Sequence, residues 1–242
     1  MSILETPDIL FEDNHLLVAV KPSGVMSQAG RSAAPDMLTL LKRHIKLRDH
    51  KPGEVFLGLV HRLDQPTSGL MVFAKTSKAA RRLSESFRGR DVEKLYLAVA
   101  RGIPDKLEDS LIDYLSKKIV NGRVTRDDQG DEAILQYQCL MQDKAKNESL
   151  LLINLVTGRR HQIRAQLSLR GMPVLGDRRY GKMDSRDREV PTLALHAAGL
   201  SFIHPVKKER LTFWQGPQIN PSFPKALTEQ LSEPLYFNDF LP

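Results

Sequence analysis

Short apolar segments bounded by turn residues recur along most of this chain, and this pattern most constrains the fold. Segments of this kind are typical of β-strands. We expect two strands within residues 9–24, and further strands at 55–60, 69–75, 93–102, 132–141, 149–156, 193–203 and 210–214. Helical periodicity is confined to segments at 36–47, 78–88, 157–171 and 224–232. Because helices do not alternate regularly with strands, the sequence predicts an α+β fold with a mixed, mainly antiparallel central sheet flanked by helices.

The segment 157–171, TGRRHQIRAQLSLRG, is rich in side chains that carry nitrogen. We expect a helix that ends at Gly171, because glycine suits the position just beyond a helix. On a helical projection one face holds Arg160, His161, Arg164 and Ser168. A surface helix shows such a face for solubility alone, but a phosphate or a buried carboxylate would also bind there.

The chain shows no long flexible linker, internal repeat or low-complexity segment. We therefore expect a single domain over residues 1–242, with a core at about 9–214 and a C-terminal tail at 215–242. No apolar run approaches the roughly 18 to 20 residues that span a bilayer, and the N-terminus lacks the pattern of a secretory signal. The single cysteine, Cys139, excludes an internal disulfide and is expected to be a core residue. These features predict a cytoplasmic protein without a membrane partner.

The chain is basic, with 36 Lys and Arg against 29 Asp and Glu, a net charge of +7 and an isoelectric point near 9.5. The basic residues fall in clusters, such as RR and RGR within 81–90, GRRHQIR at 158–164 and KKER at 207–210. A folded surface with this charge favours a polyanionic partner, of which nucleic acid is the commonest. Charge alone does not separate an enzyme that acts on RNA from a ribosomal or nucleoid protein.

Several common classes of site are not indicated by the sequence. The histidines show no metal-ligand spacing, so we expect no metal site. There is no Walker loop and no G-x-G-x-x-G at the start of a helix, so no nucleotide cofactor is expected. Ser68 lies in PTSGL rather than in a G-x-S-x-G elbow, which argues against a serine hydrolase.

One carboxylate stands at the end of a predicted strand. Asp64 lies in GLVHRLDQPTSGLMVFAK, between an apolar run and a Pro-Thr-Ser-Gly turn. On local sequence alone, the carboxylate is more typical of a turn in which it accepts backbone N–H bonds. The neighbouring Arg62 and the basic segment Arg160 to Arg164 favour a second interpretation, because an arginine beside a partly buried aspartate keeps it ionised, as a nucleophile requires.

Five segments in order along the chain resemble the RluA-type family of RNA pseudouridine synthases. HRLDQPTSGLMVFAKT resembles the family's catalytic H-R-L-D-x-x-T-S-G motif, and ILFEDNHLLVAVKPSG its opening strand pair and Lys-Pro-x-Gly turn. EKLYLAVARG resembles its K-x-Y motif, TGRRHQIRAQLSLRGMPVLGDRRYG its basic motif, and LALHAAGLSFIHP a late segment. The resemblance covers about residues 9–214, which is most of the chain, and five ordered matches are specific.

The resemblance implies a pseudouridine-synthase-like catalytic domain, a cofactor-free isomerase reaction and a role for individual residues. Asp64 would be the nucleophile or base, attacking C1′ or the uracil ring or taking a proton from C2′. Tyr96 would stack on the target base, with proton transfer as a second role, and Arg164 would hold Asp64 ionised and oriented. Ile163 would either pack near the base or face the core.

The substrate implied by the resemblance is structured RNA, tRNA or ribosomal RNA, at a uridine that is flipped out of its stack, most readily in a loop. Arg62 is expected to act as a wedge or a phosphate contact in that step, with support from His61. Arg160 and His161 of the basic motif are expected to bind the substrate. We expect the protein to be a monomer.

Two departures from the family pattern are visible. Only eight residues precede the first expected strand, so we expect no S4-type module of the kind that many relatives carry. Position 166 is Gln where the pattern usually has His, and we expect this exchange to affect RNA contacts or packing more than chemistry.

Two other functions remain open: a nucleic-acid N-glycosylase, and a non-catalytic RNA-binding protein on the same fold.

Overall fold

The structure is a computed structural model that describes residues 8–30 and 36–232. Ten strands of the described residues form one sheet, in the order β1-β2-β4-β9-β5-β8-β7-β6, with β10 paired to β9 and β3 to β4. Only β4 and β9 pair in parallel among these strands. The predicted α+β class with a mixed, mainly antiparallel sheet is therefore confirmed.

The observed strand bounds agree closely with those predicted from the sequence, except that one strand was not predicted and another is shorter than expected. The strands are β1 Asp8–Glu12, β2 Leu16–Lys21, β3 Gly58–Leu59, β4 Ser68–Ala74, β5 Glu93–Arg101, β6 Glu108–Leu115, β7 Asp131–Asp143, β8 Glu148–Leu155, β9 Leu195–Ile203 and β10 Arg210–Trp214. The expected strand at 55–60 shrinks to β3, and β6 was not predicted. In β6 every second residue is buried, but one of the inward positions is the charged Asp113, which hides the apolar alternation.

The helices are α1 Met37–Arg48, α2 Ser77–Gly89, α3 Gln162–Leu169, α4 Ser185–Glu189 and α5 Lys225–Gln230, with a short 3₁₀ helix η1 at Pro217–Ile219. The expected helix at 157–171 begins five residues late, because His161 has a left-handed backbone with φ of 53°. Its end is as predicted. Gly171 has φ of 73°, and the N–H groups of Gly171 and Met172 donate to the carbonyls of Ser168 and Leu167, as in a Schellman motif.

The helices cover both faces of the sheet. On β2 the side chains alternate: Leu17 and Ala19 share a core cluster with Met37 and Leu41 of α1, whereas Leu16 packs in a second cluster. That second cluster holds the buried α2 residues Ala79 and Leu83. Alternate side chains of a strand point to opposite faces, so α1 and α2 lie on opposite sides of the sheet. All six residues of β2 are buried, which explains its continuous apolar sequence.

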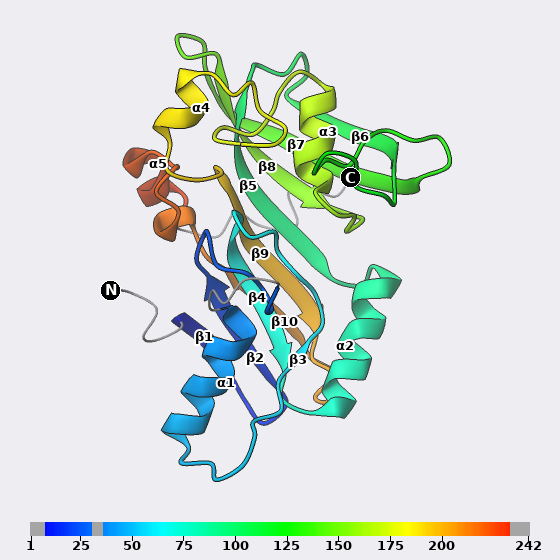
Figure 1. The fold of residues 1–242 in the computed structure, drawn as a ribbon, viewed down its shortest axis with the longest axis vertical. Coiled ribbons are helices and arrows are strands. Elements are labelled where there is room, and N and C mark those ends of the chain that lie inside the picture. Colours follow the sequence, from blue (N-terminus) through cyan, green and yellow to red (C-terminus); the bar gives the residue numbers. More distant parts are fainter. Residues whose placement is uncertain (1–7, 31–35, 233–242) are drawn as a thin grey trace.

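The sheet runs along the long axis of the molecule (Figure 1). Strands β6, β7 and β8 lie with α3 at one end, β1, β2 and β4 lie with α1 and α2 at the other, and β5 and β9 join the two ends. Within the part of the chain that the structure describes, no helix is both long and apolar enough to cross a bilayer. Residues 233–242 of the predicted tail lie outside the described residues.

Cys139 departs from its expected place in the core. It lies on β7 but is only half-buried, and it packs against the edge of the main core cluster. A register shift in the β7–β8 pairing between Cys139 and Met141 turns the strand at this point. The regular alternation of buried residues along β7 therefore ends just before the cysteine.

Candidate active site

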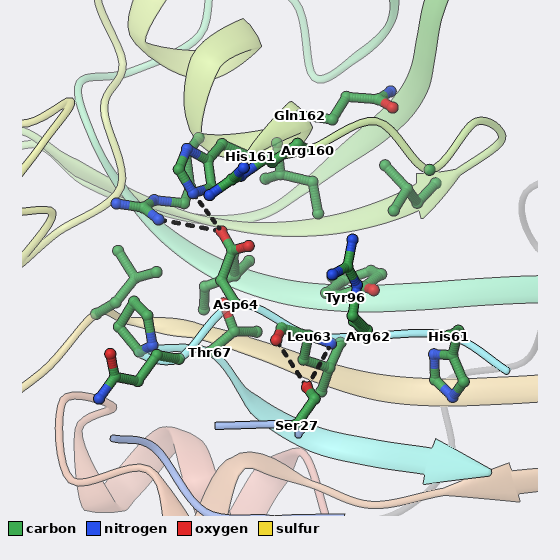
Figure 2. A pocket seen from close by; sticks show the side chains of 18 of the residues that line it. Ser27, His61, Arg62, Leu63, Asp64, Thr67, Tyr96, Arg160, His161 and Gln162 are labelled. Atoms are coloured by element: carbon green, nitrogen blue, oxygen red, sulfur yellow. Dashed lines mark hydrogen bonds and ion pairs between the residues drawn. The ribbon is translucent and has the colours of Figure 1, made fainter. Parts of the chain in front are cut away.

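A cleft of about 1300 Å³ opens around Asp64, where the two ends of the sheet meet. Its walls come from the loop that leads into β4, from the residues before and at the start of α3, and from the outward side chains of β5. Segments 24–30, 176–179 and 191–195 and the end of α2 complete it. Figure 2 shows Asp64 near the middle of this cleft, with its carboxylate directed toward the basic segment at the start of α3.

The backbone of the Asp64 loop is held by the turn that follows β2. Ser27 Oγ donates to the Leu63 carbonyl oxygen at 2.8 Å and accepts from the Leu63 N–H at 3.1 Å, so it pairs with the chain as a neighbouring strand would (Figure 2). The Ser23 hydroxyl donates to the Pro66 carbonyl at 2.7 Å, and the Gly24 N–H to that of Gln65 at 2.9 Å. These bonds fix the carbonyls on both sides of the aspartate and leave its side chain free to face the cleft.

Lys21, in the Lys-Pro-Ser-Gly turn, is completely buried. Its ammonium donates to the carbonyl oxygens of Val25 at 2.6 Å, Pro22 at 3.0 Å and Gln65 at 3.0 Å. Three acceptors use the full donor capacity of an ammonium. Burial lowers the pKa of Lys21 to about 7, although the Asp64 carboxylate opposes that shift. Lys21 therefore ties two loops together beneath the site rather than entering the cleft.

Behind Asp64, β4 follows the Asp64 loop and packs closely against β9. Gly69 pairs with Ala197 and has φ of 120°, and a Cβ atom there would overlap the Ala197 carbonyl. The buried Ser68 hydroxyl lies 2.8 Å from His196 Nδ1, and His196 Nε2 lies 2.9 Å from the Gln215 carbonyl oxygen. Because that carbonyl only accepts, His196 carries its proton on Nε2 and accepts from Ser68 on Nδ1.

Asn220 extends this buried network into the C-terminal part of the chain. Its side-chain amide donates to Ser68 Oγ at 3.0 Å and to the Leu193 carbonyl at 3.0 Å. Residues 215–222, which the sequence placed in a tail, thus contribute to the layer that supports the Thr-Ser-Gly end of the Asp64 loop.

An arginine between two carboxylates fixes the direction of Asp64. Arg164 Nη1 donates to Asp64 Oδ2 at 3.0 Å, while its Nε and Nη2 donate to the two oxygens of Asp177 at 2.7 and 2.8 Å. Asp177 is fully buried, whereas the Asp64 side chain keeps 26 % of its surface exposed. The predicted pairing of Arg164 with Asp64 is present in the structure, and the bidentate partner Asp177 was missed.

Hydrogen bonds from Arg164 and from the backbone N–H groups of Arg179 and Tyr180 lower the pKa of Asp177, against the effect of its burial. The two carboxylates in turn raise the pKa of Arg164, against burial. Both groups of the inner pair are therefore charged, and the Nη1 nitrogen is left to donate to Asp64.

His161 forms a second side of the Asp64 environment. Its Nε2 lies 3.8 Å from Asp64 Oδ2 (Figure 2), and its Nδ1 lies 3.0 Å from Tyr180 Oη. Tyr180 Oη accepts a hydrogen bond of 2.6 Å from the Val124 N–H, so its own proton is available for His161 Nδ1. That arrangement assigns the ring proton to Nε2, on the side of Asp64. Burial lowers the pKa of His161, and Asp64 opposes the shift.

Two apolar contributors to the cleft come from β5 and α3. Tyr96 on β5 is 8 % exposed, lines the cleft and lies beside Asp64 in Figure 2. Burial, and then the Asp64 charge, raises the pKa of Tyr96, so its hydroxyl stays protonated. Ile163, at the start of α3, is buried and also lines the cleft. Both residues offer the apolar surface that a planar base requires.

The remaining predicted site residues differ in their surroundings. Arg62 and Arg160 line the cleft and are exposed, as a contact to RNA requires. His61 also lines the cleft, but its Nε2 accepts from the Val72 N–H at 3.0 Å and its ring stacks on Phe87 with centroids 4.5 Å apart. Burial, and then the charge of Lys94, lowers the pKa of His61 to about 3, so its ring is neutral.

Gln166 is completely buried on α3 and does not reach the cleft. Its amide nitrogen lies 2.8 Å from the buried carboxylate of Asp113 and 3.1 Å from the carbonyl oxygens of Leu111 and Ala133. Its amide oxygen accepts from Gln162 at 3.0 Å. Of the two effects expected for the exchange at this position, the structure supports packing and excludes a direct contact with RNA.

The cleft is strongly basic. Two aspartates, Asp64 and Asp177, face a larger set of cations that line it: Arg62, Arg88, Arg90, Lys94, Arg159, Arg160, Arg164, Arg178 and Arg179. Over the described ranges, no three His, Cys, Asp or Glu side chains are grouped as metal ligands. A cleft with this charge and an apolar floor suits an anionic ligand that also presents a planar ring.

Four residues of this site carried no separate prediction: Lys21, Asp177, Tyr180 and His196. Each lies inside a segment that resembles a family motif, and each is buried and acts through another residue. The Gly-Asp step at 176–177 was the one visible signal, because it puts a carboxylate into a segment rich in arginine. The other three could not be found from spacing, since each has a partner that is distant in sequence: Gln65 for Lys21, His161 for Tyr180 and Ser68 for His196.

Comparisons with known proteins agree with this site. The model of the family described as RNA pseudouridylate synthase matches residues 15–169. Ribosomal large subunit pseudouridine synthase C of Buchnera aphidicola is 34 % identical over 220 residues, which cover 87 % of this chain and 67 % of that protein. The chain thus spans about two thirds of the length of that relative.

Two further matches span nearly the full length of both partners. The dual-specificity RNA pseudouridine synthase RluA of Escherichia coli is 34 % identical over 213 residues, which cover 85 % of this chain and 90 % of that protein. Among solved structures, human RNA pseudouridylate synthase domain containing 4 superposes with a TM-score of 0.74 at 25 % identity, covering 94 % of this chain and 95 % of the other.

Proposed function

Because this chain belongs to the RNA pseudouridylate synthase family, a family of isomerases, we propose that it converts specific uridines of tRNA or ribosomal RNA to pseudouridine, with Asp64 as the catalytic group. The observation that carries the proposal is the Asp64 carboxylate itself. It is partly exposed at the centre of a basic cleft and is held at 3.0 Å by an arginine that is fixed from behind. A carboxylate that merely capped a turn would not require this support.

The reaction conserves all atoms of the nucleotide. The bond between C1′ and N1 breaks, the uracil turns, a bond forms between C1′ and C5, and the proton of C5 is replaced by one on N1. No electrons are gained or lost, so the proposed chemistry needs no cofactor. Asp64 serves as the nucleophile or the base, and the hydrogen bond from Arg164 keeps it directed at the cleft.

The cleft residues have separable roles in this proposal. Tyr96 supports the flipped uracil by stacking, and Ile163 packs against it. Arg62 and Arg160, which are exposed on the cleft wall, contact RNA phosphates near the flipped nucleotide. His161 faces Asp64 from a second side, with Nε2 at 3.8 Å, and His61 supports β4 and α2 beside the path of the RNA.

We assign this activity to a catalytic domain of residues 9–214 together with the supporting segment 215–222. The names of the relatives support the RNA class, since one includes the ribosomal large subunit and another describes an RNA enzyme of dual specificity. A loop uridine is the expected target, because its base is already partly unstacked. A monomer in the cytoplasm is the expected state.

The proposal is tested by mapping pseudouridine at single-nucleotide resolution in total tRNA and ribosomal RNA. Cells that lack the gene are compared with cells restored by the wild type or by Asp64→Asn. We expect one or a few pseudouridines to disappear and to return only with the wild type. Restoration by Asp64→Asn would support a non-catalytic RNA-binding protein, and release of free uracil from the RNA by the purified protein would identify an N-glycosylase.

A further inference from the structure

A lysine in the cleft has a position that the roles assigned above do not use. Lys94 lies on β5 two residues before Tyr96, so both side chains point to the same face of the strand. It lines the cleft and is half-buried. Glu93, next to it in sequence, pairs instead with Arg210 at 3.0 Å. Across the described ranges, Lys94 forms no ion pair with a carboxylate.

The surroundings of Lys94 are positively charged. Arg88, in the last turn of α2, and Arg90, just beyond the helix, line the same part of the cleft. Burial, and then the charge of Arg90, lowers the pKa of Lys94 to about 8. Glu132 lies 3.5 Å from Arg90 and is the carboxylate paired with this group. Like charges that are gathered in a partly dehydrated place destabilise the fold unless an anion joins them.

The stem of Lys94 provides a second, purely structural explanation for its position. A lysine often covers apolar surface with its methylene groups while the ammonium reaches water. Here the apolar neighbours would be Phe87 and Tyr96, which line the same cleft. A stem that only covers a ring requires no charge, so a substitution that keeps the stem and removes the charge separates the two explanations.

We propose that Lys94, together with Arg88 and Arg90, binds a phosphate of the RNA backbone adjacent to the nucleotide that stacks on Tyr96. The proposal rests on the proposed function and names a contact that is separate from the Asp64–Arg164 pair. Because Lys94 and Tyr96 are neighbours on one strand face, the phosphate site and the base platform are held at a constant spacing by β5. This arrangement determines which phosphate of the RNA is bound when the target base lies at Asp64.

The test measures RNA binding apart from catalysis. Three proteins are compared: the Asp64→Asn parent, and the same protein with Lys94→Met or with Lys94→Arg. For each, the affinity for single-stranded oligouridine is measured as a function of KCl concentration. Loss of one phosphate contact reduces the slope of log K against log salt by about 0.7 for single strands and weakens binding roughly three- to tenfold. We expect this for Lys94→Met, whereas Lys94→Arg keeps the slope.

The matched control is Lys106→Met, which removes an exposed lysine that pairs with Asp109 at 3.4 Å outside the cleft. Thermal unfolding confirms that each variant is folded, and Lys94→Gln replaces Lys94→Met if the latter is not. A slope for the neutral Lys94 variant that equals that of the control would overturn the proposal, as would an equal loss in Lys94→Arg.

Failure of this inference and failure of the proposed function are distinguishable. Wild-type protein is incubated with total RNA from cells that lack the gene, and pseudouridine is mapped. A reduced slope in Lys94→Met without any pseudouridine formed by the wild type retains the phosphate site and rejects the isomerase for these RNAs. Pseudouridine formed by the wild type with an unchanged slope retains the isomerase and rejects the phosphate site.

Discussion

The buried carboxylate of Asp177 accepts two hydrogen bonds, of 2.7 and 2.8 Å, from the guanidinium of Arg164. This bidentate pair uses one edge of the guanidinium and leaves Nη1 for Asp64. The ring of Tyr180 also stacks against Arg164, with 5.1 Å between the Cζ atom and the ring centroid. The direction in which Arg164 points is therefore set by two buried groups, Asp177 and Tyr180.

We expect Asp177→Asn to lower pseudouridine formation about 100-fold, since misplacement of a group that orients the reacting carboxylate has effects of this size. The amide cannot accept two charge-assisted bonds, so Arg164 is free to turn away from Asp64. The measurement is a single-turnover assay on the RNA identified by pseudouridine mapping. Asp109→Asn, at an exposed position on β6, is the matched control.

Arg164→Lys is expected to fail as a conservative exchange, because an ammonium cannot bind both carboxylates in the observed geometry. Arg164→Leu leaves the Asp177 charge buried without its cation and costs about 3 to 5 kcal/mol of unfolding free energy. Urea denaturation measures this loss. A normal rate in Arg164→Lys would contradict the role that we assign to the bidentate pair.

Tyr180→Phe tests the assigned proton position on His161. The exchange removes the hydroxyl that lies 3.0 Å from His161 Nδ1 and leaves the Val124 N–H without its acceptor, which costs about 1 to 3 kcal/mol. We expect the ring nitrogens of His161 to change their ¹⁵N chemical shifts, because the proton is no longer held on Nε2. Tyr114→Phe, on the exposed face of β6, provides the control. Unchanged shifts would show that the tautomer has another cause.

Gly69→Ala tests the close packing of β4 on β9 behind the site. The new Cβ would overlap the Ala197 carbonyl, and alanine is strained at φ of 120°. We expect a loss of roughly 2 to 5 kcal/mol in the free energy of unfolding, from left-handed strain and overpacking together. The matched control is Gly53→Ala, where the added Cβ meets no atom within 4 Å and φ lies outside the left-handed region. That exchange should be neutral or slightly stabilising.

Most of the fold could be predicted from the sequence, because the strands carry continuous or alternating apolar residues, a pattern that is local along the chain. It missed β6 because Asp113 occupies an inward position, where it is paired with Arg170 at 3.0 Å and with Gln166. It extended α3 too far because the left-handed backbone of His161 is invisible in a helical projection. Both errors arise from contacts between segments that are distant along the chain.

For the site, the sequence indicated the side chains that face the cleft but not the groups that hold them. Asp64, Tyr96 and Arg164 were named from their motifs, and the structure brings all three to one cleft. Lys21 and His196 were missed, because a buried lysine and a buried histidine look like surface residues in a sequence. Their hydrogen bonds to Gln65 and Ser68 cross 44 and 128 residues.

The buried His196 predicts a loss of stability in mild acid. Burial lowers its pKa from 6.5 to about 4, although the hydrogen bond to the Gln215 carbonyl opposes that shift. Since the folded pKa lies below the unfolded value, the stabilisation is complete above pH 6.5 and is lost as the pH falls toward 4. The expected loss from this residue is roughly 3 kcal/mol.

Urea denaturation between pH 7.5 and 4.5 measures this effect against His196→Gln. The variant is less stable at neutral pH, but its stability should fall less steeply with acid than that of the wild type. His61, whose pKa is lowered to about 3, contributes to the same window in both proteins and cancels in the difference. Parallel pH curves for the two proteins would show that His196 does not titrate on unfolding.

Gln166 occupies a buried place in which packing can be separated from RNA recognition. Gln166→Leu has a similar size but removes the donor to Asp113 and to the Leu111 and Ala133 carbonyls, and the acceptor for Gln162. A buried carboxylate then keeps only its bond to Arg170, and we expect a loss of about 2 to 4 kcal/mol in the free energy of unfolding.

Gln166→His can still donate one hydrogen bond to Asp113, so it should lose less stability than Gln166→Leu. Because the side chain at this position is fully buried, neither exchange should change the slope of RNA affinity against salt, provided that the protein is folded at the temperature of the assay. Denaturation and salt titration on the same three proteins separate the two effects. A changed salt slope in Gln166→His would place this residue among the groups that control RNA binding, contrary to its fully buried position on α3.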